Sequence, residues 1–411
     1  MDAEIIAVGS ELLTPFRQDT NSLYLTGRLN SLGIEVRFKT IVGDDRVRLG
    51  DSLRAALDRS ELVILSGGLG PTEDDLNREV VADVLARPLH LVEEIRRRMQ
   101  ERWARLGRPM PENNLRQAMV PEGATWLENQ RGTAPGLWIE EDGRILLLLP
   151  GPPAELEAMF ETACMPLLAP RSGGRRLRTR VYKVVGLPES EVDSRIAPFY
   201  KPYRNPQTTI LSTLGTIEVH LRAQGSSDEE ADGLLTEVGD KIELALGDHI
   251  FSSRGESLEE VVGMYLVMKQ KTVAVAESCT GGLLAEHLTR MPGSSTFFLG
   301  GVVCYSNELK TRLVGVPAAL IASVGAVSKP VAQALAEGIR RRAASAIGVG
   351  ITGIAGPGGG TPEKPVGLVF VALADDLSTE VRQFRFPGER ERVRTWASVA
   401  ALEMIRRRVR D

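Results

Sequence analysis

The spacing of apolar residues predicts an alternation of strands and helices over the first 168 or so residues. Short apolar runs favour buried strands, whereas apolar positions that recur every three or four residues favour amphipathic helices. The strands expected here are residues 4–8, 34–42, 61–66 and 145–149. The helices expected between them are residues 20–32, 47–58, 75–86, 92–106 and 154–167. Such alternation is typical of a mostly parallel sheet with helices on both faces.

Two breaks in the pattern divide the rest of the chain. A basic stretch rich in proline and glycine, residues 169–176, predicts a linker. After it, a small βαββα unit is expected, with elements at residues 178–185, 189–199, 208–214, 217–223 and 228–246. A second break at residues 252–255 precedes another alternating region. Its strands are expected near residues 272–276, 301–305, 347–351, 366–374 and 380–386, with helices at 258–268, 283–289 and 390–410 among others. We therefore expect three domains, at residues 1–170, 171–253 and 254–411.

Composition narrows the classes of function. Of the 411 residues, 43% are apolar and 25% charged, which is typical of a soluble globular protein. The net charge of −4 creates no overall field that attracts polyanions, so strong nucleic-acid binding is not expected. No apolar run is long enough to cross a bilayer. The cysteines Cys164, Cys279 and Cys304 are odd in number and far apart, as expected of reduced thiols in the cytoplasm.

A glycine turn in the first domain predicts a phosphate site. Residues 65–75 join the end of an expected strand to an acidic helix start. Glycine amides can approach a phosphate there, and the helix N-terminus adds a favourable dipole. The candidate phosphate ligands are Gly67, Gly68, Gly70 and Thr72. Asp74 and Asp75 can hold a divalent cation against that phosphate, since hard cations take oxygen ligands. The alternative is that Thr72 and Asp75 only cap the helix.

Two further turns follow other expected strands of this domain. Loops at the carboxyl ends of parallel strands share one crevice, so these turns are expected to converge on the same ligand. Their candidate residues are Glu11, Asn21, Gly151 and Pro152, with Asp44 as a further metal ligand. Taken singly, Glu11 is also explained as a helix-start acid and Asp44 as a turn residue.

The last domain gathers groups suited to nucleophilic catalysis. Ser278 follows an expected strand in a turn of hydroxyls and glycines, and Ser295, Tyr305 and Lys310 come within the next thirty-odd residues. A lysine near a helix start is pushed toward its neutral form, which can act as a general base. If Ser295 lies within reach of Lys310, the two form a Ser-Lys pair that needs no histidine. The alternative is a surface lysine and a turn hydroxyl.

A second glycine loop, residues 351–360, follows another expected strand of this domain. Its glycines predict amide donors for an oxyanion or a phosphate. The residues of the two turns that are expected to bind substrate are Ser278, Thr280, Gly281, Gly282, Thr352, Gly353 and Gly356.

These motifs resemble a known family along essentially the whole chain. Residues 1–168 resemble the molybdopterin-binding (MoCF-like) fold, and the order of the three regions resembles the CinA family of competence/damage-inducible proteins. The runs 276–282, 292–295, 305–310, 352–360 and 364–367 are similar to the CinA carboxyl-terminal domain and to nicotinamide mononucleotide amidohydrolases. The βαββα unit is similar to KH-like modules but lacks their Gly-x-x-Gly clamp.

The resemblance implies a multidomain α/β protein, with a MoCF-like α/β sandwich, a KH-like α+β module and an α/β amidohydrolase domain. It implies deamidation of nicotinamide mononucleotide in the last domain without a cofactor, and divalent-metal-dependent hydrolysis of ADP-ribose in the first. Ser295 would be the nucleophile, Lys310 the base and Tyr305 a proton relay or lysine orienter, although the choice between Ser278 and Ser295 stays open. Arg390 would pair with the substrate phosphate. The family also implies a homodimer, and the alternative function is a non-catalytic nucleotide- or pterin-binding regulator linked to competence or DNA damage.

Overall fold

The computed structural model describes residues 1–213 and 215–410, so Leu214, at the end of an expected strand, and Asp411 lie outside the described residues. The contacts divide the chain into two compact units. One contains residues 1–178 with 223–233, and the other contains residues 179–222 with 234–411. Among the described residues, no helix combines the length and the apolar character needed to span a membrane.

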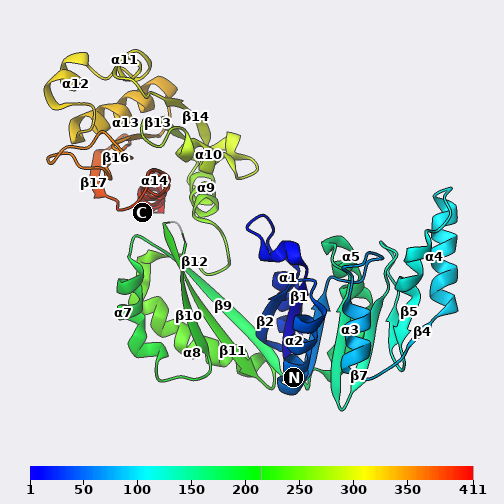
Figure 1. Ribbon diagram of the computed structural model, residues 1–411. Coiled ribbons are helices and arrows are strands. Elements are labelled where there is room, and N and C mark those ends of the chain that lie inside the picture. Colours follow the sequence, from blue (N-terminus) through cyan, green and yellow to red (C-terminus); the bar gives the residue numbers. More distant parts are fainter. Residues whose placement is uncertain (214, 411) are drawn as a thin grey trace. The chain divides into compact units, whose positions relative to one another are not determined.

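The first domain is built on a mixed six-stranded sheet with the order β2-β1-β3-β8-β7-β6. Figure 1 labels its strands β1, β2 and β7. Its strands are β1 (Asp2–Val8), β2 (Glu35–Val42), β3 (Leu62–Ser66), β6 (Thr125–Leu127), β7 (Gly136–Glu141) and β8 (Arg144–Leu149). Strands β2, β1, β3 and β8 are parallel, and β7 and β6 are antiparallel. The expected strands are therefore confirmed, and the parallel ones end at the same edge of the sheet.

Alternate residues of these strands feed two separate cores. Ile6 and Val63 pack with α2 (Arg46–Arg59), α3 (Asn77–Val84) and α4 (Glu93–Arg105). Ile5 and Ile64 pack on the opposite face with α1 (Asn21–Ser31) and α5 (Pro153–Met159). Because side chains alternate across a strand, each central strand is buried on both faces, which gives three layers.

Several expected elements of this domain need correction. The short strands β6 and β7, and the separate two-stranded sheet of β4 (Leu89–Leu91) and β5 (Met119–Pro121), were not expected. The helix expected at residues 154–167 is interrupted by a π-helical turn, Phe160–Cys164, before α6 (Met165–Leu168). Pro166 explains the interruption, because it has no amide hydrogen for an α-helical bond. The helix expected to begin at Asp75 begins at Asn77 instead.

The middle module has the expected βαββα order and ends in an additional short strand. Its elements are β9 (Arg176–Val185), α7 (Glu189–Tyr200), β10 (Gln207–Ser212), β11 (Thr216–Gly225), α8 (Asp228–Leu246) and β12 (Ile250–Ser252). The four strands form one sheet with the order β10-β11-β9-β12.

The carboxyl-terminal domain has a five-stranded sheet with the order β14-β13-β15-β16-β17. Its strands are β13 (Val273–Glu277), β14 (Phe298–Val303), β15 (Ile347–Gly353), β16 (Leu368–Ala374) and β17 (Thr379–Arg385). Its helices are α9 (Leu258–Met268), α10 (Leu283–Thr289), α11 (Asn307–Leu309), α12 (Ala318–Val324), α13 (Lys329–Ala343) and α14 (Arg390–Arg410). Helices α9, α10 and α14 pack on one face, and α12 and α13 on the other (Figure 1).

Small residues let α13 lie close to the middle of this sheet. A Cβ atom added to Gly350 of β15 would lie 2.5 Å from the amide nitrogen of Ala336 on α13. A Cβ atom added to Gly348 would likewise lie 2.2 Å from the Ala336 carbonyl oxygen on the same helix. Neither position therefore has space for a larger residue. Strands β14, β13 and β15 are parallel, so the turns at their carboxyl ends lie at one edge.

Candidate active sites

The candidate site of the carboxyl-terminal domain lies just beyond β13, where Ser278 meets Lys310. The Ser278 amide donates to the Ile351 carbonyl oxygen at 3.1 Å, which fixes the turn against the neighbouring strand β15. Lys310 begins a π-helical turn that follows α11. Its Nζ atom lies 3.1 Å from Ser278 Oγ, within hydrogen-bond distance. Both residues are buried, with 8% of Ser278 and 2% of Lys310 exposed.

The surroundings of Lys310 favour an uncharged amine. Its Nζ atom also donates to the Cys304 carbonyl oxygen at 3.0 Å and the Tyr305 carbonyl oxygen at 3.1 Å. Burial lowers the pKa of Lys310 below its ordinary value because the charged form loses its hydration. A neutral amine has two hydrogens and one lone pair. When the two hydrogens bind the two carbonyls, the lone pair is left for the Ser278 hydroxyl.

The structure corrects the expected partner of Lys310. Ser295 lies in an exposed 3-10 turn, Ser294–Thr296, and no hydrogen bond joins it to Lys310 among the described residues. The hydrogen bonds of Lys310 Nζ go to Ser278 and the two carbonyl groups instead. The neighbouring Cys279 is a poor nucleophile, because burial raises the pKa of its thiol to about 12.

Tyr305 and Arg390 form the exposed side of the same site. Arg390, the first residue of α14, donates to the Tyr305 hydroxyl at 2.9 Å and to the Gly356 carbonyl oxygen at 2.9 Å. Tyr305 is 56% exposed. Its main-chain carbonyl, rather than its phenol, contacts Lys310. The structure thus brings together Ser278, Lys310, Tyr305 and Arg390. Ser278 and Lys310 form the pair suited to nucleophilic attack, and Arg390 provides a positive charge beside it.

The glycines of the first turn shape it. Gly281 and Gly282 have φ values of +62° and +97°, which favour glycine. Their amides donate to the Ser278 carbonyl oxygen and to the Glu277 carboxylate. The Thr280 hydroxyl is fully buried and has no hydrogen-bond partner among the described residues.

The second glycine loop contains two glycines that are closely packed. A Cβ atom at Gly353 would lie 2.7 Å from the Val369 side chain, and one at Gly356 would lie 2.6 Å from that of Val366. These glycines permit close packing, and the presentation of their amides to a ligand stays a prediction. The Thr352 hydroxyl is also engaged, since it donates to the Ala326 carbonyl oxygen at 2.8 Å.

Glu277 was missed by the sequence analysis and holds the nucleophile turn in place. Its carboxylate accepts hydrogen bonds from the amides of Gly282 at 3.0 Å, Leu284 at 3.1 Å and Ala285 at 2.8 Å. These are amides at the start of α10, where a negative charge is also favoured by the helix dipole. The sequence did contain a signal for this role, because an acidic residue directly precedes the Ser-Cys-Thr-Gly-Gly turn at the start of a helix.

Glu277→Ala should therefore lower the free energy of unfolding by about 2–4 kcal/mol, since each buried donor left unsatisfied costs about 1–3 kcal/mol. Urea denaturation followed by circular dichroism measures this change. Glu286→Ala is the matched control, because Glu286 is an exposed residue of α10 that forms an ion pair with Arg290. That control should change stability by about 0.5 kcal/mol or less. Equal effects of the two substitutions would contradict the capping role.

The candidate site of the first domain is a pocket of about 590 Å³ beyond the carboxyl ends of β1, β3 and β8. We call it the glycine-loop pocket. It brings together almost all residues selected from the sequence: Glu11, Asn21, Asp44, Gly67, Gly68, Gly70, Asp74, Asp75, Gly151 and Pro152. Thr72 is the exception and does not line it. Asn21 ties two of the loops together, since its Nδ2 atom donates to Ser66 Oγ at 3.0 Å and to the Gly151 carbonyl oxygen at 2.8 Å.

Asp75 has a structural role in this loop. Its carboxylate accepts from the Gly70 amide at 2.7 Å, from the Thr72 amide at 2.9 Å and from the Thr72 hydroxyl. The alternative that Asp75 is a capping residue thus explains its hydrogen bonds. The amides that it caps belong to the glycine loop before α3. Asp44 is partly engaged as well, because it accepts from the Ser10 amide at 2.8 Å.

The carboxylates of this pocket suit a hard cation that is coordinated partly by the protein and partly by the phosphate of a bound ligand. Asp74 is exposed and lines the glycine-loop pocket together with Asp44 and Glu11. The described residues contain no group of three or more metal-ligating side chains positioned around one point. One or two carboxylates with phosphate oxygens and water form a common Mg²⁺ environment, and these residues can supply that number.

Three buried residues that the sequence analysis missed support or line the pocket. Arg78 is 1% exposed and donates to the carbonyl oxygens of Leu69 and Gly70, both at 2.8 Å. The Asn77 Nδ2 atom donates to the Gly67 carbonyl oxygen at 2.7 Å. Gln117 lines the pocket from a 3-10 helix, Glu112–Ala118, that is remote in sequence. Arg78 and Asn77 have the polarity of a solvated helix face, so the pattern gave no sign of their burial.

Three family descriptions match consecutive parts of the chain. Residues 4–170 match the probable molybdopterin binding domain, residues 179–252 the damage-inducible protein CinA KH domain, and residues 255–409 the CinA C-terminal domain. A CinA-like protein of Koribacter versatilis is 52% identical over 413 residues and is matched over the full length of both chains. A putative competence-damage inducible protein of Acetivibrio thermocellus is 43% identical, covering 100% of this chain and 99% of that one.

A solved structure also resembles part of the chain. The protein CinA with unknown function from Thermoplasma acidophilum is 32% identical with a TM-score of 0.38, covering 41% of this chain and 99% of that one.

Proposed function

The chain belongs to the CinA family, and from this premise we propose that it hydrolyses pyridine-nucleotide fragments at two separate sites. The carboxyl-terminal domain deamidates nicotinamide mononucleotide to nicotinic acid mononucleotide and ammonia. The first domain hydrolyses the pyrophosphate bond of ADP-ribose with a divalent metal ion. The observation that carries the proposal for the amidase is the buried contact between Ser278 Oγ and Lys310 Nζ at 3.1 Å.

The first half of the amidase reaction uses Ser278 as nucleophile. Neutral Lys310 takes the hydroxyl proton while Ser278 Oγ attacks the carboxamide carbon. The resulting ammonium of Lys310 then donates that proton to the leaving nitrogen as the C–N bond breaks. Ammonia departs, and an ester joins Ser278 to the nicotinoyl group.

The second half releases the acid. A water molecule gives a proton to Lys310 and attacks the ester carbonyl, which breaks the bond to Ser278 Oγ. Lys310 returns the proton to Ser278 Oγ, and the carboxylic acid that forms releases its own proton to solvent and leaves as a carboxylate. Arg390 and the Tyr305 hydroxyl, at the exposed side of the site, bind the phosphate of the substrate and orient its carboxamide toward Ser278.

In the first domain, the glycine loop 67–70 binds the pyrophosphate of ADP-ribose, and Asn21 holds two loops of this pocket together through its hydrogen bonds to Ser66 and Gly151. Asp74 and Asp44 would hold the divalent ion, which when bound neutralises the charge on the phosphate oxygens. Asp75 and Arg78 keep the loop in its binding shape through their hydrogen bonds to Gly70.

Ammonia release from nicotinamide mononucleotide by the intact chain, without added metal, tests the amidase. The kcat/KM for this release should rise with pH, because Lys310 must be neutral to accept the serine proton. Burial lowers the Lys310 pKa below its ordinary value, so activity is present above that lowered pKa and is lost as pH falls through it. The increase in kcat/KM should therefore level off at a pH below the ordinary pKa of lysine.

Lys310→Arg is the matched control for the pH profile. Its guanidinium stays protonated, so no activity should return at any pH. A wild-type rate that is flat or falls as pH rises would remove Lys310 as the base. Binding of nicotinamide mononucleotide without any ammonia release would favour the regulatory alternative.

A further inference from the structure

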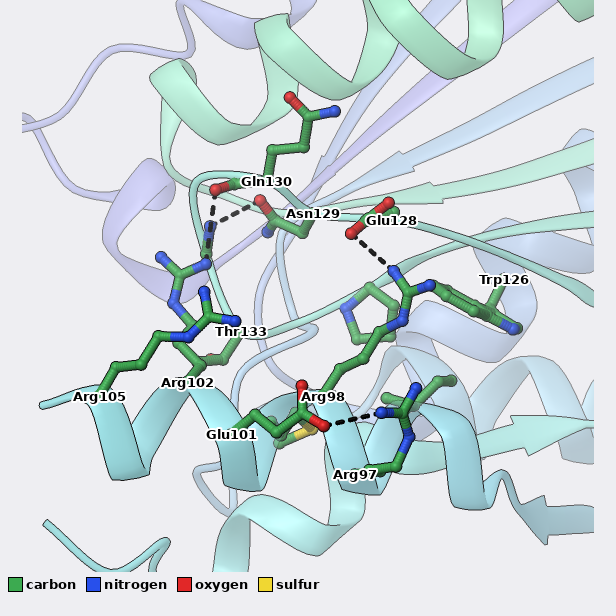
Figure 2. Close-up of a pocket in the computed structure, with 14 residues that line it drawn as sticks. Arg97, Arg98, Glu101, Arg102, Arg105, Trp126, Glu128, Asn129, Gln130 and Thr133 are labelled. Carbon is green, nitrogen blue, oxygen red and sulfur yellow. Dashed lines mark hydrogen bonds and ion pairs between the residues drawn. The ribbon is translucent and has the colours of Figure 1, made fainter.

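A second pocket of the first domain is lined by arginines and carries no assigned role. It has a volume of about 600 Å³ and lies between α4 and residues 126–135 (Figure 2). Volumes of this size are typical of sites for small molecules. We call it the arginine pocket. The polar and aromatic residues that carry the argument are Arg98, Arg102, Arg105, Trp126, Gln130 and Thr133.

The arginine pocket has two positive charges that no carboxylate balances. Arg97 pairs with Glu94 and Glu101, and Arg98 pairs with Glu94 and Glu128. In the part of the chain that the structure describes, Arg102 and Arg105 have no carboxylate partner. They lie one turn apart on α4, a spacing at which like charges repel. An anion bound between them would remove that repulsion.

The two unbalanced arginines differ in how they are held. Arg102 donates to the carbonyl oxygens of Gln130 at 3.5 Å and Arg131 at 2.9 Å, which orients its guanidinium. Arg105 is exposed and has no hydrogen bond to any described residue, so all its donors are available. Figure 2 shows both side chains extending from α4 toward Gln130 and Thr133. Guanidinium groups in this arrangement suit the oxygens of a phosphate.

The arginine pocket also contains an aromatic side chain, Trp126. The guanidinium carbon of Arg98 lies 5.1 Å from the centre of the Trp126 ring, a cation–π distance. Trp126 is half-buried and lines the same pocket. A pocket that contains a flat indole and two guanidinium groups without carboxylate partners can recognise a ligand with both a planar ring and a phosphate.

The loop that closes this pocket is firmly anchored. The Asn129 Nδ2 atom donates to the Ala134 carbonyl oxygen at 2.9 Å and to Glu155 at 2.7 Å. Its Oδ1 atom accepts from the amides of Arg131 and Gly132. Thr133 also lines the glycine-loop pocket, so the two pockets share this wall.

From these observations we propose that the arginine pocket is a second ligand site that binds a nucleoside monophosphate. Arg102 and Arg105 hold its phosphate, and Trp126 packs against its base. The proposal does not depend on either hydrolytic activity, because Arg102, Arg105 and Trp126 line neither candidate active site.

Tryptophan fluorescence of the full chain tests this proposal, with AMP as the probe. Inorganic phosphate and adenosine, the two parts of AMP, are tested separately. AMP should change the emission of the wild type but not of Trp126→Phe. Arg105→Ala should weaken AMP binding about tenfold, as expected for the loss of a charge-assisted hydrogen bond. Arg102→Ala/Arg105→Ala should weaken it about 100-fold.

Arg96→Ala/Arg108→Ala is the matched control, since it removes two charges outside the pocket and should leave AMP binding unchanged. The single Arg105 variant keeps the test valid if loss of Arg102 disturbs the loop. Hydrogen exchange of residues 128–134 gives a second readout, with AMP expected to slow it. The proposal is overturned if AMP affects neither signal, if Arg105→Ala binds AMP normally, or if adenosine or phosphate binds as tightly as AMP.

Discussion

Ser278→Ala is expected to reduce ammonia release from nicotinamide mononucleotide by at least about 1000-fold, the scale seen when a covalent nucleophile is removed. The substitution deletes the oxygen that lies 3.1 Å from Lys310 Nζ and leaves the rest of the site in place. Stability should change by only about 1 kcal/mol, because a neutral lysine keeps both its hydrogens bonded to the carbonyls of Cys304 and Tyr305. Substrate binding, measured by calorimetry, should persist.

Ser295→Ala is the matched control, since it makes the same chemical change at an exposed hydroxyl. It should retain deamidation within about twofold of the wild type, as expected for a surface position outside the reactive pair. The reverse result, with Ser295 essential and Ser278 dispensable, would restore the pairing that the sequence favoured. Loss of activity in both variants with normal folding would mean that both hydroxyls act in the reaction.

The choice between the two serines illustrates the limit of the sequence. Ser295 is nearer to Lys310 along the chain, while Ser278 is 32 residues away. Nearness in sequence carried no information here, because Ser278 and Lys310 are brought together by the pairing of β13 with β14. The burial of Lys310 was equally hidden, since residues 307–314 have the polarity of an exposed helix. A π-helical turn places this lysine inward.

The glycine-loop pocket was predicted more fully. Parallel strands carry their following loops to one edge, so recognising β1, β3 and β8 was enough to place Glu11, Gly67 and Gly151 together. The residues that support the loop could not be predicted in this way. Arg78 and Gln117 are polar side chains buried by tertiary contacts, and their partners are main-chain carbonyls that no side-chain pattern reveals.

The same reasoning separates the two adjacent aspartates of this pocket. Asp75 accepts three hydrogen bonds from Gly70 and Thr72, whereas Asp74 is exposed and faces the pocket. Asp74→Ala should therefore reduce metal-dependent hydrolysis of ADP-ribose at least about 100-fold, if it holds the cation that stabilises the phosphate charge. The free energy of unfolding should change by about 0.5 kcal/mol or less, as for an exposed side chain.

Asp75→Ala should behave differently, because it leaves the amides of Gly70 and Thr72 without their acceptor. We expect a loss of about 2–3 kcal/mol in unfolding free energy and weaker binding of ADP-ribose even without metal.

Titrating Mn²⁺ during AMP release from ADP-ribose distinguishes the two variants. Asp74→Ala should raise the metal concentration required, while Asp75→Ala should leave that requirement unchanged but raise KM. Glu73→Ala controls for charge, since Glu73 is exposed and does not line the pocket. If Glu73→Ala and Asp74→Ala lowered the rate equally, the effect would come from net charge and Asp74 would not be a ligand.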